Sequence, residues 1–302
     1  MNTRNGKVIV VVTAATILTS LLVAYLLRET SPDLKGVVGN ITKKIELLAD
    51  MRVNLLKSQE MEKSAVMADT DEASGDFAKE SLRIDDMVDG DRKKLQALLA
   101  QDHTDQEMKL FQEFEACWEE LKKEDKEILD FAVQNTNLKA AALSFGKGKE
   151  VITRFEEALN RLIHSNPSND SRCEAVQMAS DALAAGLKIY AMQAPHIAAA
   201  NDEQMDAIEA QMRREGEIVD NALDRLAGLT PGQEVATLEA AKQAYVEFSA
   251  VTGEVVRLSR ENTNIKSFAL SLGKKRKIAT QCDEILTSLQ EAVRNREFKA
   301  TR

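Results

Sequence analysis

The sequence predicts an all-α protein, with an N-terminal transmembrane helix followed by two tandem antiparallel four-helix bundles. Three observations lead to this prediction. Only four prolines and thirteen glycines interrupt 302 residues, and residues common in helices, such as Ala, Leu, Glu and Lys, dominate the composition. An uncharged apolar stretch lies close to the N-terminus. One sequence pattern also occurs twice in a constant register, which indicates an internal duplication.

The apolar stretch, residues 8–27, reads VIVVVTAATILTSLLVAYLL. As a helix it would be about 30 Å long, which is enough to cross a bilayer core. Arg4 and Lys7 precede it, whereas Arg28 is followed by the acidic Glu29, so the positive-inside rule places the N-terminus in the cytoplasm. A cleaved signal peptide is the alternative. Its apolar core would be shorter and followed by a small-x-small site, so an uncleaved anchor is favoured.

The repeated pattern links the two halves of the chain. Gln134 to Glu150 reads QNTNLKAAALSFGKGKE, and Glu261 to Lys277 reads ENTNIKSFALSLGKKRK, at an offset of 261 − 134 = 127. Asparagine and threonine are good helix-capping residues. We therefore expect both Asn-Thr-Asn turns to cap helices, through Asn135, Thr136, Asn137, Asn262, Thr263 and Asn264.

Each copy is expected to supply four helices. Turn signals occur near residues 69, 102 and 136 in the first copy and near 200, 231 and 263 in the second. Short turns favour antiparallel neighbours and hence an up-down-up-down bundle. The expected divisions are a cytoplasmic stub and anchor (1–29), a first bundle (30–165), a linker (166–171) and a second bundle (172–302).

The third helix of the first copy has an apolar seam interrupted at Glu124, and Val251 occupies the equivalent place in the second copy. We therefore expect the second copy to be better packed and the first to carry the ligand or partner surface. Cys117 and Cys282 fall at apolar helical positions and are expected to be buried free thiols. The basic run at 274–277 is expected to be a solvated helix face and not a phosphate site.

The composition and motifs argue against several classes of function. A net charge of −9 argues against a nucleic-acid partner. The three cysteines form no CxxC pair and the three histidines no HxxxH pair, so neither a metal nor a cofactor is predicted. An enzyme is not expected, because the sequence has no Gly-rich phosphate loop and no GxSxG motif.

Several features together resemble the extracytoplasmic four-helix-bundle sensor domain of methyl-accepting chemotaxis proteins. They are the stretch from Glu261 to Lys277, the aromatic residue midway along the helix before it (Tyr245, with Trp118 in the first copy), the anchor that leads directly into the first helix, and LLADMR at Leu47 to Arg52. The resemblance extends over nearly the whole chain, once per copy. It implies a single-pass protein of the bacterial inner membrane, with the N-terminus in the cytoplasm and the body in the periplasm.

Proteins of that family dimerise, bind small ligands, often carboxylates, between helices, and signal by a displacement of the last helix. Their linker module and cytoplasmic signalling hairpin have no counterpart in this sequence, so a lateral partner receptor is expected. The resemblance makes Arg52 a candidate carboxylate ligand, although pairing with an acid on its own helix is the favoured interpretation. Lys57, matched by Lys188 in the second copy, is the second candidate. A scaffolding protein of the envelope without a ligand is the alternative function.

Overall fold

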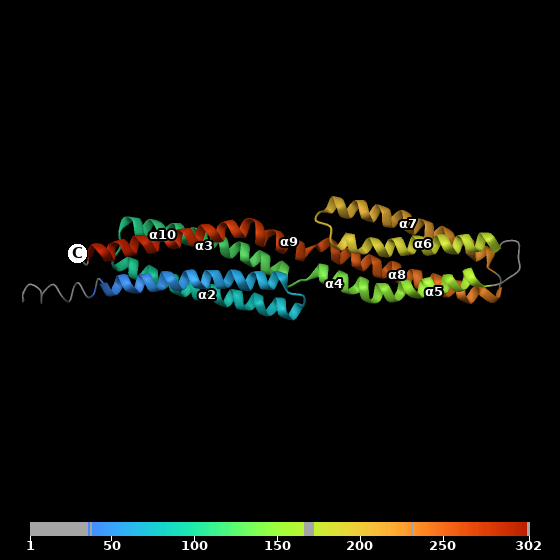
Figure 1. The fold of residues 1–302 in the computed structure, drawn as a ribbon, viewed down its shortest axis with the longest axis horizontal. Coiled ribbons are helices and arrows are strands. Elements are labelled where there is room, and N and C mark those ends of the chain that lie inside the picture. The colour runs from blue at the N-terminus through green and yellow to red at the C-terminus, as the bar shows by residue number, and fades with distance from the viewer. Residues whose placement is uncertain (1–35, 37, 166–171, 231, 301–302) are drawn as a thin grey trace, which may run out of the picture. The chain divides into compact units, whose positions relative to one another are not determined.

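The computed structural model describes residues 36, 38–165, 172–230 and 232–300, and the secondary structure of this part is helical throughout (Figure 1). The predicted anchor at 8–27 and the predicted linker at 166–171 lie outside the described residues. Among the helices that are described, none has both the length and the apolar composition needed to cross a membrane.

The helices begin and end close to the positions that the sequence predicts. A first helix spans residues 38–67, and the breaks near 69, 102, 136, 200, 231 and 263 all separate elements. The further elements are α2 (Asp71–Gln101), α3 (Asp105–Ala132), α4 (Thr136–Leu143), η1 (Ser144–Gly148), α5 (Lys149–His164), α6 (Arg172–Ile197), α7 (Asp202–Leu229), η2 (Gly232–Glu234), α8 (Val235–Glu261), α9 (Thr263–Leu270), η3 (Ser271–Lys275) and α10 (Arg276–Ala300).

The chain forms two compact units that are not contiguous in sequence. Unit 1 contains Met1–Met61, Lys79–Glu124 and Lys274–Arg302, and unit 2 contains Glu62–Ala78 and Asp125–Gly273. Most of unit 2 is therefore inserted, in chain order, between α3 and α10 of unit 1.

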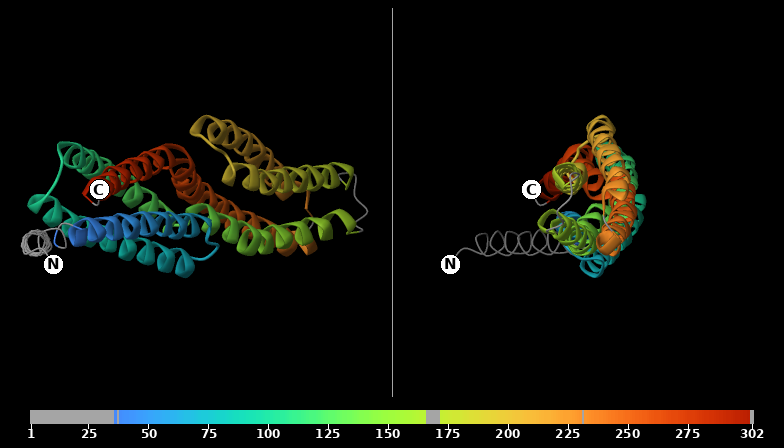
Figure 2. Two further views of the ribbon diagram at one scale, coloured as in Figure 1. Left: turned by 60° about the vertical axis from the view of Figure 1, so that its left-hand side comes forward. Right: turned by 90° about the vertical axis from the view of Figure 1, so that its right-hand side faces the viewer.

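Each unit takes its fourth helix from the other copy of the repeat. In unit 1, the helix of residues 38–67 shares a core with α2, α3 and α10, to which α10 contributes Ile278 and Leu286. In unit 2, α6, α7 and α8 share a core with α5, which contributes Phe155 and Leu159. The four helices of each unit lie side by side in Figures 1 and 2. The equivalent fourth helices of the two copies have thus been exchanged, as in a domain swap within one chain.

This division differs from the expected tandem bundles at 30–165 and 172–302. The reason is that the two fourth helices are copies of each other, so either one presents a suitable apolar face to either set of three helices. We expected the Asn-Thr-Asn turn to fold the fourth helix back onto the third. Instead, α5 packs against α6 and α8, and each turn contains a single left-handed residue, Asn135 (φ 50°) or Asn262 (φ 53°).

The duplicated threonines meet each other. The hydroxyl oxygens of Thr136 and Thr263 lie 3.1 Å apart, and each hydroxyl oxygen also accepts a hydrogen bond from the other residue's backbone N–H at 3.2 Å. Both residues are buried. The two copies therefore form a local, nearly two-fold symmetric contact, which we call the Thr clasp, between the starts of α4 and α9.

The asparagines extend this contact. The backbone N–H of Asn137 donates to the side-chain oxygen of Asn264 at 3.1 Å, and the reciprocal bond measures 3.2 Å. The Asn137 side chain donates to Asn262 at 2.8 Å, and the Asn264 side chain donates to Asn135 at 3.0 Å. Neither α4 nor α9 has a capping hydrogen bond from its own N-cap side chain. The side chains of Thr263 and Asn264 thus accept hydrogen bonds from N–H groups at the start of α4, and those of Thr136 and Asn137 do the same for α9, so each copy caps the helix of the other. The side chains of Asn135 and Asn262 instead bond to other asparagines.

A disulfide crosslinks unit 1, which makes the expectation of two free thiols wrong. Cys117 of α3 and Cys282 of α10 are bonded, with their Cα atoms 5.7 Å apart. The sequence placed both correctly at buried apolar positions. It did not show that they face each other, because that follows from the exchange of the fourth helices. Cys173 is free and exposed.

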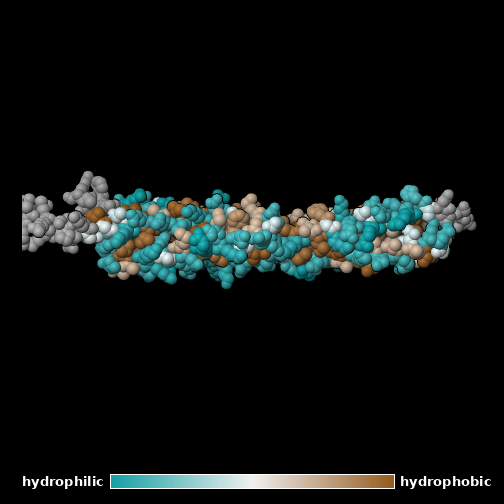
Figure 3. Space-filling model, turned by 90° about the horizontal axis from the view of Figure 1, so that it is seen from below, coloured by the Kyte–Doolittle hydropathy of each residue, from teal (hydrophilic) through white to brown (hydrophobic). Residues whose placement is uncertain are grey.

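The basic run at the start of α10 is not simply a solvated face. Lys275 is only 1% exposed, and Lys274 forms an ion pair with the buried Glu124 of α3 in the same unit. This pair explains why the apolar seam of the third helix is interrupted at Glu124. Elsewhere, the face drawn in Figure 3 is largely hydrophilic, with scattered apolar side chains, as expected for solvated helices.

Candidate ligand-binding site

Unit 2 contains an open groove between α6, α7 and α8, with a volume of about 430 Å³. Helix α7 forms one wall and α8 the other, and Ile189 of α6 lies at the bottom with Met212 and Phe248. The lining residues are Ile189, Glu209, Met212, Arg213, Gly216, Glu217, Asp220, Tyr245, Phe248, Ser249, Thr252, Gly253 and Val256. Clefts that combine an apolar base with a few polar groups are the usual form of small-molecule sites.

Tyr245 provides the aromatic part of the α8 wall. Its ring packs against Phe155 and Phe248, with centroid distances of 5.5 and 6.5 Å. A side chain at Gly216 would place its Cβ 3.4 Å from the Tyr245 hydroxyl, so the glycine allows this hydroxyl to approach α7. Burial and the negative charge of Asp220 raise the pKa of Tyr245 to about 12. The phenol is therefore neutral at physiological pH and can both donate and accept a hydrogen bond.

The charged side chains of the groove all come from α7. Burial and the neighbouring Asp224 raise the pKa of Asp220 above its usual value. Glu217 lies one turn before Asp220 and Arg213 one turn before Glu217, as the helical spacing of α7 dictates. None of Arg213, Glu217 and Asp220 has an ion pair among the described residues. Their charges are therefore available to a ligand.

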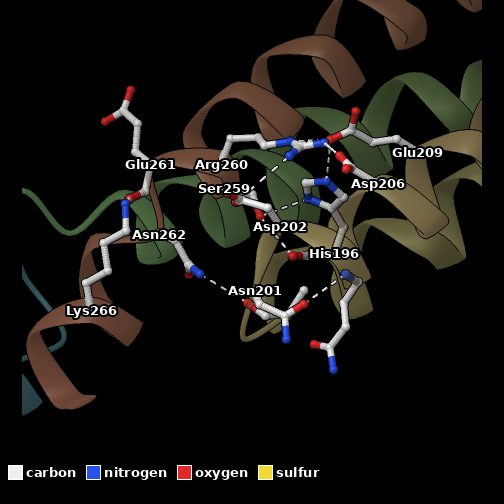
Figure 4. Close-up of polar contacts among 12 residues, drawn as sticks. His196, Asn201, Asp202, Asp206, Glu209, Ser259, Arg260, Glu261, Asn262 and Lys266 are labelled. Carbon is white, nitrogen blue, oxygen red and sulfur yellow. Dashed lines mark hydrogen bonds and ion pairs between the residues drawn. The ribbon is translucent and has the colours of Figure 1, made fainter.

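A hydrogen-bonded cluster, drawn in Figure 4, lies around Glu209, a residue of the groove lining. Glu209 of α7 accepts hydrogen bonds from Arg260 Nε at 2.7 Å and from His196 Nε2 at 2.9 Å. The hydrogen bond from Arg260 lowers the pKa of Glu209 and, together with His196, outweighs the opposing effect of burial. Glu209 is therefore charged and already partnered, so it acts as part of the framework.

His196 joins three helices in this cluster. It is fully buried in α6, and its Nδ1 lies 2.9 Å from the hydroxyl of Ser259 in α8. The Ser259 hydroxyl also lies in hydrogen-bond contact, at 3.0 Å, with the backbone carbonyl oxygen of His196. With the bond from His196 to Glu209 of α7, these contacts hold α6, α7 and α8 together at one end of the groove.

A second buried chain connects the groove to the π-helical segment η1. The Gln193 side-chain amide donates to the hydroxyl of Thr252 at 2.9 Å, and the Ser144 hydroxyl donates to the side-chain oxygen of Gln193. Thr252 lines the groove, and Ser144 begins η1. A π-helical segment inside an α-helix often marks a functional position. A ligand that touches Thr252 would thus be two hydrogen bonds from η1.

The residues predicted as ligands are elsewhere. Arg52 belongs to unit 1, where its Nε donates to Asp283 of α10 at 2.8 Å; the hydrogen bond to Asp283 raises the pKa of Arg52. Its acidic partner therefore comes from another helix and not from its own. Lys57 is exposed in the helix of residues 38–67. Neither residue lines the groove.

Of the two mid-helix aromatics, Trp118 is fully buried in unit 1. Tyr245 both joins the core of unit 2 and lines its groove. The groove was not predicted, and its lining helices α6, α7 and α8 all belong to the second copy, whereas the ligand or partner surface was expected on the first. Two signals in the sequence were available: Gly216 in the middle of a long helix, and the hydroxyl of Thr252 in an otherwise apolar seam.

The fold is thus that of four-helix bundles, and unit 2 has an open groove between three of its helices. A comparison with known protein families matches residues 7–171 to the family described as a four helix bundle sensory module for signal transduction. The match covers more than half of the 302 residues, so the chain belongs to this family. A comparison with curated proteins gives no significant match.

Proposed function

We propose that this protein is a membrane-anchored, extracytoplasmic sensory module that binds a small molecule in the groove of unit 2. The single observation that carries the proposal is the groove itself, because it brings together the Tyr245 hydroxyl and charged side chains that have no ion pair within the described residues, above an apolar base of Ile189, Met212 and Phe248, in a chain of a sensory family. A scaffolding protein has no need of such a groove, so the groove favours the sensory function over that alternative.

Two features support the extracytoplasmic placement. Structural disulfides persist in oxidising compartments and are rare in the cytosol, and Cys117 and Cys282 form one inside unit 1. The uncharged segment at 8–27, with Arg4 and Lys7 before it, supports an anchor whose N-terminus is cytoplasmic. A reporter that is active only outside the cytoplasm should therefore work when fused to the C-terminus, and a cytoplasmic reporter should not.

Signalling, in chemotaxis or a related response, is proposed to pass through a lateral partner, either a second copy or another receptor. The helix of residues 38–67 supports this because it leaves Val53 and Leu56, one turn apart, 49% and 56% exposed. Apolar side chains grouped on an outer helix face are typical of a contact surface. Substituting both with serine is expected to reduce crosslinking between copies, or to a co-expressed receptor, in membranes.

The binding function is tested by filling the groove. A tryptophan in place of Ser249, an exposed lining residue, would occupy the groove without disturbing the core. In a thermal-shift screen of small metabolites on the full chain in mild detergent, compounds that raise the melting temperature of the wild type should not raise that of Ser249→Trp.

The matched control is Ser180→Trp, which makes the same change at an exposed position of α6 outside the groove and should respond like the wild type. If no compound distinguishes Ser249→Trp from Ser180→Trp, the scaffolding function is the better explanation. The same screen tests Arg52 as a carboxylate ligand, since a carboxylate would have to compete with Asp283 for its guanidinium.

A further inference from the structure

A cluster of four charged side chains lies at one end of unit 1. Lys44 belongs to the helix of residues 38–67, Asp102 to the turn between α2 and α3, Glu107 to the first turn of α3, and Arg296 to α10. The start of the helix of residues 38–67 and the end of α10 lie at the same end of the unit in Figure 1. Lys44 Nζ donates to the Asp102 carbonyl oxygen and, at 3.3 Å, to Glu107 Oε2. Arg296 Nη2 donates to Asp102 Oδ1.

The charges of this cluster balance, but its hydrogen bonds are incomplete. Three of its atoms, Asp102 Oδ2, Glu107 Oε1 and Arg296 Nη1, are buried and have no hydrogen-bond partner among the described residues. Glu107 Oε2 lies 3.7 Å from Arg296 Nη1, which is too far for a hydrogen bond. Each of the three atoms has lost water without gaining a partner, so the observed arrangement has a cost in free energy.

The two halves of the cluster differ in their access to water. The side chains of Lys44 and Glu107 are fully buried, and Glu107 also forms a capping box with Thr104 at the start of α3. The side chains of Asp102 and Arg296, in contrast, are 29% and 24% exposed. An outward movement of the end of α10 would therefore hydrate two of the three unpartnered atoms, while Lys44 and Glu107 stay in the core.

Little else holds the end of α10 in unit 1. The disulfide at Cys282 fixes the helix to α3, and Val293 is the last described side chain of α10 that joins the core. The side chains described beyond it are Arg294, Asn295 and Arg296. Of these, only Arg296 has a hydrogen bond or an ion pair within the described part of the chain. The docking of these last turns therefore depends on one guanidinium group.

We propose that Asp102 and Arg296 form an ionic latch that docks the end of α10 at low ionic strength and releases it at high ionic strength. Salt screens charges at partly exposed positions and so favours the separated, hydrated pair. The unpartnered atoms lower the free energy needed for opening, and the disulfide and the core up to Val293 keep the rest of α10 in place. The latch is a conformational device of unit 1 that responds to the salt content of the medium, and it does not involve the groove of unit 2.

The test is hydrogen–deuterium exchange of the full chain in mild detergent, measured by mass spectrometry on two fragments of α10. The backbone amides after Val293 report on the latch, and those between Cys282 and Leu289 report on the core. Raising the NaCl concentration from about 0.01 M to about 1 M shortens the Debye length from roughly 30 Å to roughly 3 Å. In the wild type, this change should speed exchange after Val293 by about twofold or more and leave the central amides unchanged.

Two substitutions should open the latch without added salt. Arg296→Gln should speed exchange after Val293 by about fivefold or more at low salt, because a hydrogen bond between charged groups is lost. Salt should then have no further effect. Asp102→Asn should act in the same way, and the double variant should exchange no faster than either single variant, since both changes break the same contact.

The matched control is Arg294→Gln, the same change two residues earlier at an exposed side chain. It should leave the exchange rate within about twofold of that of the wild type. Equal acceleration of both α10 fragments in Arg296→Gln would mean that Arg296 supports the whole bundle, and would overturn the latch. An unchanged rate in Arg296→Gln, or a wild type whose α10 end does not respond to salt, would overturn it as well.

Discussion

The hydroxyls of Thr136 and Thr263, 127 positions apart, lie 3.1 Å from each other in a buried contact. They occupy the same position in the two copies of the repeat, so the duplicated motif is in contact with itself. This accounts for the presence of Asn-Thr-Asn at both sites, because each copy needs the other's side chains to satisfy its first helical N–H groups.

The Thr clasp predicts a specific energetic coupling. Thr136→Val and Thr263→Val should each lower the free energy of unfolding by about 1–3 kcal/mol, because each leaves a buried N–H of the other copy without its acceptor. The double variant should cost less than the sum of the two, by about 1 kcal/mol, since both single changes remove the same contact between hydroxyls. Urea unfolding of the four proteins measures this.

The control pair is Thr42→Val and Thr280→Val. Both hydroxyls are exposed, and each donates a hydrogen bond only to the backbone carbonyl four residues earlier in its own helix. Their effects should be small and additive. Additive effects in the clasp pair as well would mean that the contact between Thr136 and Thr263 does not contribute to stability.

The disulfide predicts a large and selective effect of reduction. Replacing Cys117 and Cys282 with alanine should destabilise unit 1 by roughly 2–5 kcal/mol, because the bond closes a long loop in the unfolded chain. A reducing agent should have the same effect on the wild type and none on the double variant. Cys173→Ala, at the exposed free thiol, is the matched control and should unfold like the wild type.

The space around two glycines, Gly186 and Gly228, predicts that replacing each with alanine changes the stability in opposite directions. A Cβ at Gly186 in α6 would lie 2.9 Å from the Phe155 ring in the core of unit 2. Gly186→Ala should therefore destabilise by about 1–3 kcal/mol through overpacking. Gly228→Ala in α7, where nothing lies within 4 Å, should instead stabilise by up to about 1 kcal/mol. Thermal unfolding shows whether the two shifts differ in sign.

A buried ion pair in unit 1 predicts that replacing one partner destabilises the protein more than replacing both. Lys44 and Glu107 are both fully buried, with Nζ and Oε2 3.3 Å apart. Lys44→Met should cost about 3–5 kcal/mol, because Glu107 then loses its closer partner and keeps only Arg296, whose Nη1 lies 3.7 Å from its Oε2. Lys44→Met with Glu107→Leu should recover most of this loss. A double variant as unstable as the single one would show that other contacts of Lys44, such as that to the Asp102 carbonyl, dominate.

The hydrogen bonds of Asp89 predict that the protein loses stability in acid. Tryptophan fluorescence can follow this loss. Burial raises the pKa of Asp89, but hydrogen bonds from Trp118, Lys122 and Arg92 outweigh it, so the net pKa is lowered. A carboxyl group whose pKa is lower in the folded than in the unfolded protein stabilises the fold at pH values above its unfolded pKa, which is about 3.9 for aspartate. This contribution is lost as the pH falls through the folded pKa.

Trp118 is the one tryptophan of the sequence, and its Nε1 donates to Asp89 at 2.9 Å. Its emission should therefore change as Asp89 is protonated below pH 4, and the urea midpoint should fall with it. Asp89→Asn should lack this acid-dependent change. An identical pH profile in the variant would assign the change to another carboxylate.

The local structure followed from the sequence more closely than the tertiary arrangement. Helix boundaries near 69, 102, 200 and 231 were predictable because polar breaks and apolar periodicity act over a few residues. The exchange of α5 and α10 was not, since both helices come from one ancestral segment and have the same pattern. Which core each joins is decided by tertiary contacts, such as that of Cys282 with Cys117, 165 positions apart, and that of Phe155 with Tyr245.

The candidate site was less predictable for the same reason. Asp220 and Tyr245 are ordinary helix residues in the sequence, and only the packing of α7 against α8 brings them together. Arg52 was chosen by resemblance, and the structure assigns it a partner, Asp283 of α10, that the expected tandem division had placed in the other bundle.

The bond between Cys117 and Cys282 has a consequence for motion. A covalent crosslink between α3 and α10 prevents either helix from sliding lengthwise past the other, so a stroke of the last helix alone is impossible in the oxidised protein. Any axial displacement in unit 1 must move α3 and α10 together as one rod. The helix of residues 38–67 and α2 are then the elements left to shift against that rod.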